Sequence, residues 1–322
     1  MSITPPGPLS PALGPAPEPA LEPALRPALI EASPAERIST PVDGVHVLGA
    51  ISPSRAGDFM SCPLMYRFRT IDRLPEEPSP DAVRGTVVHK VLEDLFDLPA
   101  LDRTPERAAD LLVPAWDVLL EAEPGLAEMF GGEGPDVATW LTSCRTVLDR
   151  YFELEDPRRL EPADRELYVE ALLDSKLLLR GFVDRIDVAP DGRIRIVDYK
   201  SGRSPGVGYE AKALFQMKFY ALVIWRLRGV VPSMLQLIYL GNGEILRYEP
   251  DEDDLRATER KVEAVWAAIQ LAHETADWRP SPSRLCDWCS YHQFCPTKGG
   301  TVPPLPERPA PVPDVSTDEA DD

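Results

Sequence analysis

The sequence predicts a mixed α/β fold, because segments of helical periodicity are followed by strands, a helix, a second strand pair and a last helix. At 322 residues and 43% hydrophobic content, the chain can bury a substantial core. We expect one large domain over residues 46–298. No internal repeat of solenoid length occurs.

The first expected helix covers residues 48–68, with Ser52-Pro53-Ser54 at its start and Cys62-Pro63 near its end. The second, over 81–98, has apolar residues at helical spacing and places His89 in its middle. Further helices are expected over 104–122, 136–153, 209–228 and 251–276.

Strands are expected over residues 165–173, 177–188, 193–199, 233–240 and 244–248, since the hydrophobic period there changes to two. Pro190-Asp191-Gly192 is typical of a three-residue hairpin loop. If Ala189 pairs with Arg193, Asp184 lies directly opposite Asp198, with Cβ atoms roughly 5 Å apart. In the preceding pair, a turn at 174–176 places Glu166 opposite Asp184.

Asp184 and Asp198 would share their face with Phe182, Ile186, Ile194, Ile196 and Lys200. Two carboxylates on an otherwise apolar face persist only if they are protonated, paired or bound to a cation. A divalent ion with oxygen ligands fits this place. The alternative is a surface hairpin whose aspartates pair with Arg185 or Lys200.

The net charge of −19 argues against broad, non-specific adhesion to nucleic acid. A locally basic groove remains compatible with it, and the alternative is a solvated acidic surface. Candidate groove residues are Arg67, Arg69, Arg73, Lys200, Arg203, Lys212 and Lys218. No G-x4-G-K-[ST] loop occurs, so the chain is not an ATP-driven motor.

The ends of the chain differ in composition from its middle. Residues 1–45 are rich in Pro and Ala and residues 299–322 are Pro-rich and then acidic, so we expect two disordered tails. The first residues lack the pattern of a signal peptide, and no run is long enough to span a membrane. We therefore expect a soluble cytoplasmic protein.

Four of the five cysteines are grouped as a metal site would require: Cys286-x2-Cys289-x5-Cys295, with Cys62 far upstream. Four thiolates fit either an iron–sulfur cluster or a structural zinc ion. His292 keeps a Cys3His zinc site open as an alternative. Cys144, among apolar residues of an expected helix, is interpreted as a buried free thiol.

Together these motifs resemble the RecB-type exonuclease branch of the PD-(D/E)XK nuclease superfamily, including its relatives that carry a four-cysteine iron–sulfur cluster. The resemblance covers roughly residues 50–297 and lies in the order of the motifs, which are Ser61-Cys62-Pro63, Gly85-Thr-Val-Val-His89, Gly181-Phe-Val-Asp184-Arg, Asp198-Tyr-Lys200, Gln216-Met-Lys-Phe-Tyr220 and the terminal cysteines. It implies a mixed central sheet flanked by helices, a helical insertion and a C-terminal cysteine cluster.

The resemblance also implies roles for individual residues. His89, Asp184, Asp198 and the backbone carbonyl of Tyr199 would bind Mg²⁺ or Mn²⁺. Lys200 would activate water, Glu166 would add a carboxylate with Glu170 as second choice, and Gln216 and Tyr220 would hold the DNA strand. Cys62, Cys286, Cys289 and Cys295 would bind a [4Fe-4S] cluster.

The function implied is metal-dependent cleavage of DNA, as single strands or at duplex ends, in repair or recombination. The alternative is a catalytically weak DNA-binding or scaffold module. With either function, the protein would suit a helicase as its partner.

Overall fold

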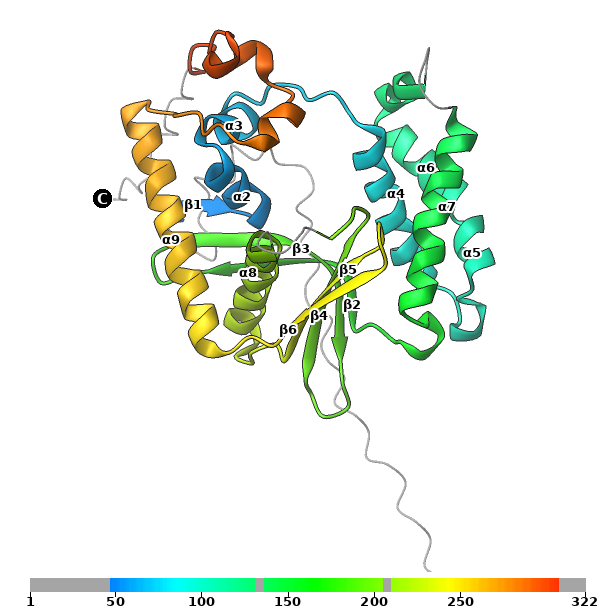
Figure 1. Cartoon of the computed structure of the whole chain (residues 1–322). Helices are drawn as coiled ribbons and strands as arrows, with labels where there is room; N and C mark the ends of the chain where they lie inside the picture. The colour runs from blue at the N-terminus through cyan, green and yellow to red at the C-terminus, as the bar shows by residue number, and fades with distance from the viewer. Residues whose placement is uncertain (1–46, 131–135, 205–209, 307–322) are drawn as a thin grey trace, which may run out of the picture. The chain divides into compact units, whose positions relative to one another are not determined.

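The computed structural model describes residues 47–130, 136–204 and 210–306. It confirms the mixed α/β class: a six-stranded sheet carries helices on both faces (Figure 1). The expected tail at 1–45 lies outside the described residues, as do residues 307–322 of the other tail.

Six strands form the sheet. They are β1 (Gly49–Ile51), β2 (Asp164–Leu172), β3 (Leu177–Val188), β4 (Ile194–Lys200), β5 (Met234–Tyr239) and β6 (Glu244–Tyr248). The order is β1-β3-β4-β5-β6, and β2 pairs with the other edge of β3. β1 with β3 and β4 with β5 are parallel pairs, whereas the three remaining pairs are antiparallel.

The hairpin registers expected from the sequence are confirmed. Arg185 pairs with Val197 and Val188 with Ile194, and Ala189 N–H donates to the Arg193 carbonyl at 2.9 Å. Gly192 has φ of +83°, the left-handed conformation that a three-residue loop needs. The β2–β3 register also follows the sequence: the pairs on either side of Glu166 place it opposite Asp184.

Helices cover both faces of the sheet. On one side lie α2 (Pro53–Ser61), α3 (Pro63–Tyr66), α8 (Glu210–Arg228) and α9 (Glu252–Thr275), and on the other α4 (Pro80–Leu95), α5 (Pro105–Asp110), α6 (Leu112–Ala122) and α7 (Val137–Leu154) (Figure 1). A π-helix spans Arg67–Ile71, and 3-10 turns span Ala100–Asp102, Pro124–Phe130, Pro157–Arg159, Arg284–Trp288, His292–Phe294 and Pro296–Lys298.

The expectation of a single helix over 48–68 is wrong. Residues Gly49–Ile51 form β1 instead, and Ser52 then caps α2 by accepting the N–H of Arg55. The helix ends at Cys62 because the ring of Pro63 cannot continue it and instead starts α3. Gly49 is required there, since a Cβ atom would lie 2.1 Å from the Trp266 ring.

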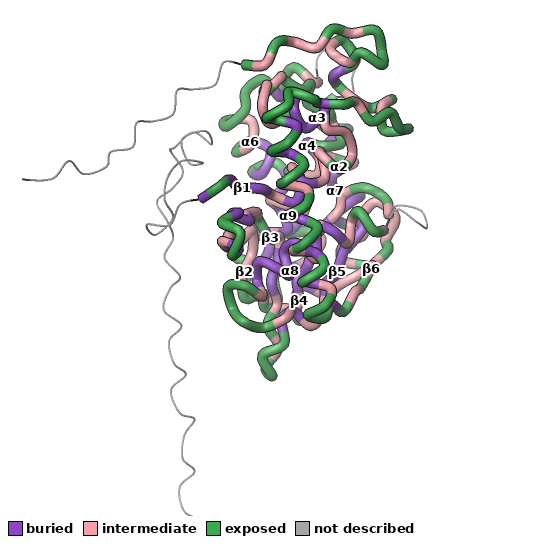
Figure 2. The backbone as a smooth tube through the Cα atoms, turned by 90° about the vertical axis from the view of Figure 1, so that its left-hand side faces the viewer, coloured by how far each residue is buried: buried purple, intermediate pink, exposed green. Residues whose placement is uncertain are grey.

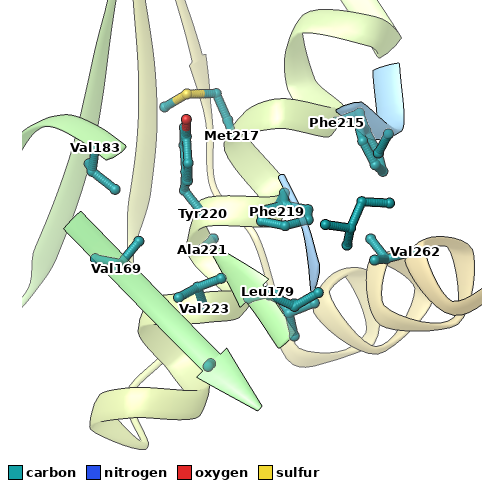
Figure 3. Packing of buried hydrophobic residues seen from close by; sticks show 14 of the residues in the cluster. Val169, Leu179, Val183, Phe215, Met217, Phe219, Tyr220, Ala221, Val223 and Val262 are labelled. Carbon is teal, nitrogen blue, oxygen red and sulfur yellow. The ribbon is translucent and has the colours of Figure 1, made fainter. Parts of the chain in front are cut away.

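Two hydrophobic cores lie on opposite faces of the sheet. The first packs α2, α8 and α9 against it, with Met217, Phe219 and Val223 wholly buried (Figure 3). The second packs α4–α7 against Val197, Tyr199 and Ile238 of the other face. Buried residues are therefore concentrated in the strands and in α8 (Figure 2).

The described residues of the expected C-terminal tail contact the domain. Residues 299–306 are described, and Val302 and Leu305 pack against the first core. Arg67 Nη2 donates a hydrogen bond to the Pro303 carbonyl at 2.5 Å. This buried arginine, 6% exposed, thereby ties the segment to the domain.

Candidate active site

The candidate site lies where β3 and β4 separate. Their pairing ends at Arg185 and Val197, after which β4 continues beside β5 alone. The Tyr199 N–H, left without a strand partner, donates to Asp184 Oδ2 at 2.7 Å. The fork thus fixes the Asp184 carboxylate at the point where the sheet opens.

Three predicted residues meet at this fork. The ligand atoms of His89, Glu166 and Asp184 all lie within 4.8 Å of one another, close enough to share one metal ion. His89 Nδ1 is 3.5 Å from Asp184 Oδ2 and 3.8 Å from Glu166 Oε1. The sequence had given Glu166 only a supporting role, whereas the structure places it in the set.

Glu166 reaches the site through an unusual backbone conformation. Its φ is +42°, a left-handed value that is costly for a residue with a side chain. The pairing of β2 with β3 is regular on both sides of this residue. The strain is therefore local, and it sits at a carboxylate of the candidate metal site.

The ring of His89, on α4, is oriented by the backbone of β4. Its Nε2 lies 2.9 Å from the Tyr199 carbonyl oxygen, which can only accept, so Nε2 carries the proton. Nδ1 is the nitrogen that faces the two carboxylates. The Tyr199 carbonyl, expected as a metal ligand, here holds the histidine in position.

The carboxylates raise the pKa of the groups around them. Burial lowers the pKa of His89, but the nearby Glu166 carboxylate and the charges of Asp184 and Asp198 outweigh it and bring the value to about 9. Burial, followed by the charge of Asp198, raises the pKa of Asp184 to about 7. The fork therefore favours positive charge, as a proton or as a cation.

Asp198, Lys200 and Gln216 form a second group beside the first. Gln216, on α8, donates to Asp198 Oδ1 at 2.9 Å and accepts from Lys200 Nζ at 2.9 Å. Lys200 Nζ lies 2.7 Å from Asp198 Oδ2. Asp198 is only 2% exposed, and the Lys200 ammonium is the cationic partner of its Oδ2.

Tyr220 is placed in the core and not on the surface. It is 6% exposed and lies between Val183 and Met217, where burial raises its pKa (Figure 3). Its ring packs against β3, and contact of Tyr220 with a DNA strand stays a prediction. Glu170, the second choice for the extra carboxylate, lies outside the three-residue set and accepts a hydrogen bond from Tyr168 at 2.7 Å.

Of the residues expected on the face of the two aspartates, Ile186, Ile194 and Ile196 are buried, whereas Phe182 is 56% exposed. Phe182 lies in the stretch of β3 between the residues paired with β1 and those paired with β4. Its neighbour Val183 packs into the first core.

Arg185 is the buried residue that sequence reasoning missed. It is 1% exposed and forms an ion pair with Glu155 at 2.9 Å. Its guanidinium also donates to the Tyr199 hydroxyl at 2.5 Å. In the sequence, its position directly after Asp184 was the only indication of a role. The contact with the Tyr199 hydroxyl becomes visible only in the fold.

The four grouped cysteines line one pocket of about 260 Å³. Cys62 ends α2, whereas Cys286, Cys289 and Cys295 come from the 3-10 turns at the other end of the domain. Backbone N–H groups of Ser281 and Ser283 lie 3.4 Å from Cys62 Sγ and 3.3 Å from Cys286 Sγ. Cys144 lies apart from them, buried in the second core.

His292 also lines this pocket, but its Nε2 contacts the backbone carbonyl of Cys286. Burial, and then the three neighbouring thiols, raise the pKa of the Cys289 thiol. Mutual repulsion of this kind is relieved when a metal centre binds the thiolates.

A mixed sheet that opens at a set of carboxylates, a histidine and a lysine defines a nuclease-like site. The sequence model of the PD-(D/E)XK nuclease superfamily matches residues 50–296. The chain therefore belongs to this superfamily of nucleases.

Two individual proteins are similar to it. The Gene 69 protein of Mycobacterium phage D29 is 26% identical over 270 residues, which cover 76% of this chain and 96% of the phage protein. A crystal structure from Eubacterium rectale titled "Putative exonuclease" is 14% identical with a TM-score of 0.49, covering 74% of this chain and 86% of that one. No helix in the described part of the chain is long and apolar enough to cross a membrane.

Proposed function

We propose that this nuclease is a RecB-type, Mg²⁺- or Mn²⁺-dependent deoxyribonuclease that acts on single-stranded DNA or duplex ends. The observation that supports it is the convergence of His89, Glu166 and Asp184 beside the Asp198–Lys200 pair. A bound divalent ion in this place would lower the pKa of a coordinated water and neutralise charge on the phosphate.

The residues fit such an ion. Asp184, Glu166 and the Nδ1 atom of His89 are the donors nearest to one another, and Asp198, whose Oδ2 is paired with the Lys200 ammonium at 2.7 Å, is the next carboxylate. Oxygen donors with one imidazole suit magnesium or manganese. The Tyr199 carbonyl fixes the histidine ring, so the donor set is held ready by the backbone of β4.

Lys200 is the residue that we assign to proton transfer and charge stabilisation. Its ammonium group, about one third exposed, is held between Asp198 and Gln216 and can reach a phosphate oxygen or the attacking water. Gln216 orients both neighbours from α8, which makes it a positioning residue.

Cleavage of labelled single-stranded DNA tests the assignment. Lys200→Ala should lower the rate by about 10²- to 10⁴-fold, because a positioned proton donor or acceptor contributes that much. Lys261→Ala, on α9 and away from the fork, should cut like the parent protein. Equal cutting by the Lys200 variant would contradict the assignment, and binding without cleavage under every metal would favour a non-catalytic role.

We further propose that Cys62, Cys286, Cys289 and Cys295 bind a [4Fe-4S] cluster. All four cysteines line one pocket, and they come from both ends of the domain. The N–H groups directed at two sulfurs suit the same assignment.

Anaerobic purification with iron, sulfide and zinc analysis tests this site. We expect a brown protein containing iron and sulfide, and a Cys289→Ser variant that loses both and unfolds more readily. Cys144→Ala is the matched control, since this thiol lies in the other core and should leave the iron content unchanged. A colourless preparation with zinc would contradict the cluster.

A further inference from the structure

Arg55, Arg73 and Arg180 form no ion pair with a carboxylate among the described residues, although Glu170 is the cross-strand neighbour of Arg180. We call Arg55, Arg73 and Arg180 the arginine cluster. Arg55 is partly buried, and Arg180 and Arg73 both repel its charge. Arg180 comes directly after Leu179, the last residue of β3 that pairs with β1. The next residue, Gly181, is close to α2, because a Cβ atom added there would lie 3.5 Å from Pro53.

Burial, and then the charges of Arg180 and Arg73, lower the pKa of Arg55. A guanidinium that is partly removed from water beside two like charges pays for desolvation and for repulsion. The chain carries 53 Asp and Glu against 34 Lys and Arg, so carboxylates to neutralise the cluster are plentiful in the sequence. Most other arginines, such as Arg67 and Arg165, do have such partners. The cluster is suited to an anion from outside the chain.

An exposed aromatic pair lies next to the cluster. Tyr168 of β2 and Phe182 of β3 are cross-strand partners, with ring centroids 5.2 Å apart. The Tyr168 hydroxyl donates to Glu170 at 2.7 Å, which fixes its ring. Phe182 remains 56% exposed. A flat apolar surface is thus held rigidly at the protein surface.

The aromatic pair and Arg180 follow the candidate metal site along strands β2 and β3. Glu166 and Asp184 come first, Tyr168 and Phe182 follow two residues along the strands, and Arg180 follows two residues further. Each step is roughly 6.6 Å along a strand. The aromatic pair therefore lies between the carboxylates and the arginine cluster.

We propose that Phe182, supported by Tyr168, and the arginine cluster form a track that binds single-stranded DNA leading from the metal site. This inference rests on the proposed function and assigns its substrate contacts. The exposed ring of Phe182 stacks on a base, and the guanidinium groups bind the phosphates that follow.

The aromatic ring is the part of the track that selects a single strand. The faces of bases within a duplex are covered by their neighbours, whereas an unpaired strand presents them for stacking. An arginine cluster alone would bind any polyanion. The combination is therefore what distinguishes this surface from a general anion site.

Binding of a fluorescently labelled oligothymidine to the full chain, in EDTA so that no cutting occurs, tests the track. Phe182→Ala should weaken binding about 5- to 100-fold, the usual loss for one base-stacking ring, and Phe182→Trp should retain it. Arg180→Gln should reduce the slope of log K against log salt by about 0.7. Leu271→Ala and Arg145→Gln, exposed residues of α9 and α7, are the matched controls and should bind as the parent does.

Cleavage by the same variants in Mg²⁺ or Mn²⁺ separates the two proposals. A parent protein that cuts DNA while Phe182→Ala and Arg180→Gln bind normally would overturn the track and leave the nuclease assignment intact. A parent that binds the oligothymidine through these residues but never cuts would support the track and contradict the nuclease assignment. No binding by the parent, or an equal loss on a blunt duplex, would overturn the track.

Discussion

At the scale of single residues, Gly181 shows why the stretch before Asp184 begins with glycine. A Cβ atom there would lie 2.8 Å from Cε1 of the buried Tyr220 ring. The ring in turn packs beneath β3, beside Val183 (Figure 3). The absence of a side chain at Gly181 therefore lets α8 approach the strand that carries Asp184.

Gly181→Ala should accordingly lower the free energy of unfolding by about 1–3 kcal/mol, because a well-packed core does not accept an added methyl group without displacement. Urea denaturation measures the change. Gly57→Ala is the matched control: nothing lies within 4 Å of its added Cβ, and alanine should stabilise helix α2 by about 0.5–1 kcal/mol. The same sign for both variants would contradict the steric explanation.

The residues of the site were only partly predictable from the sequence. The Pro-Asp-Gly loop fixes the register that sets Asp184 opposite Asp198, and the pattern before it places Glu166 beside Asp184. The role of the Tyr199 carbonyl was not predictable, because it depends on His89 arriving from a helix 110 residues away. The burial of Tyr220 likewise depends on Gly181, and helical spacing alone cannot show it.

At the scale of elements, the helices and hairpins followed their local sequence, whereas the fork did not. Its cause is the parallel pairing of β4 with β5, which begins at Arg195 and Met234 and continues to Lys200. The strands of a parallel pair are joined by a long crossover, which here contains α8, so no local sequence pattern predicts this pairing. β1 was missed for a similar reason, since three residues become a strand only beside β3.

One buried group joins the helix α7 to the sheet beneath the site. Glu155, which caps the end of α7, accepts from Arg185 of β3 at 2.9 Å and from Gln236 of β5 at 2.9 Å. Arg185 Nη1 also donates to the Tyr199 hydroxyl of β4. The Arg185–Glu155 ion pair thus joins three strands and the end of one helix.

Arg185→Met should lower the free energy of unfolding by about 3–5 kcal/mol, because it leaves the buried Glu155 carboxylate without its partner. Adding Glu155→Gln to this variant should recover part of the loss, which thermal or urea unfolding of the double-mutant cycle measures. Arg193→Ala, which removes an exposed ion pair with Asp191, should leave the stability nearly unchanged. Additive effects at 155 and 185 would contradict the coupling.

At the scale of the whole molecule, the fork makes folding stability depend on pH. Asp184 has a pKa of about 7 against an ordinary 3.8, and His89 of about 9 against 6.5. Both values are raised, so the folded protein keeps protons that the unfolded chain releases. The stability these protons contribute is full at low pH and is lost as pH rises, from 3.8 to about 7 for Asp184 and from 6.5 to about 9 for His89.

A divalent cation replaces those protons, so its stabilising effect should grow as they leave. We expect the increase in Tm caused by Mg²⁺ or Mn²⁺, relative to EDTA, to be small near pH 6.5 and larger near pH 9, the interval over which His89 loses its raised-pKa proton. Differential scanning calorimetry across this range measures it. In Asp184→Asn the repulsion and one ligand are both removed, so the increase should be smaller at every pH and should no longer grow. An increase in the parent that is equal at both ends of the range would mean that the cation binds away from the fork.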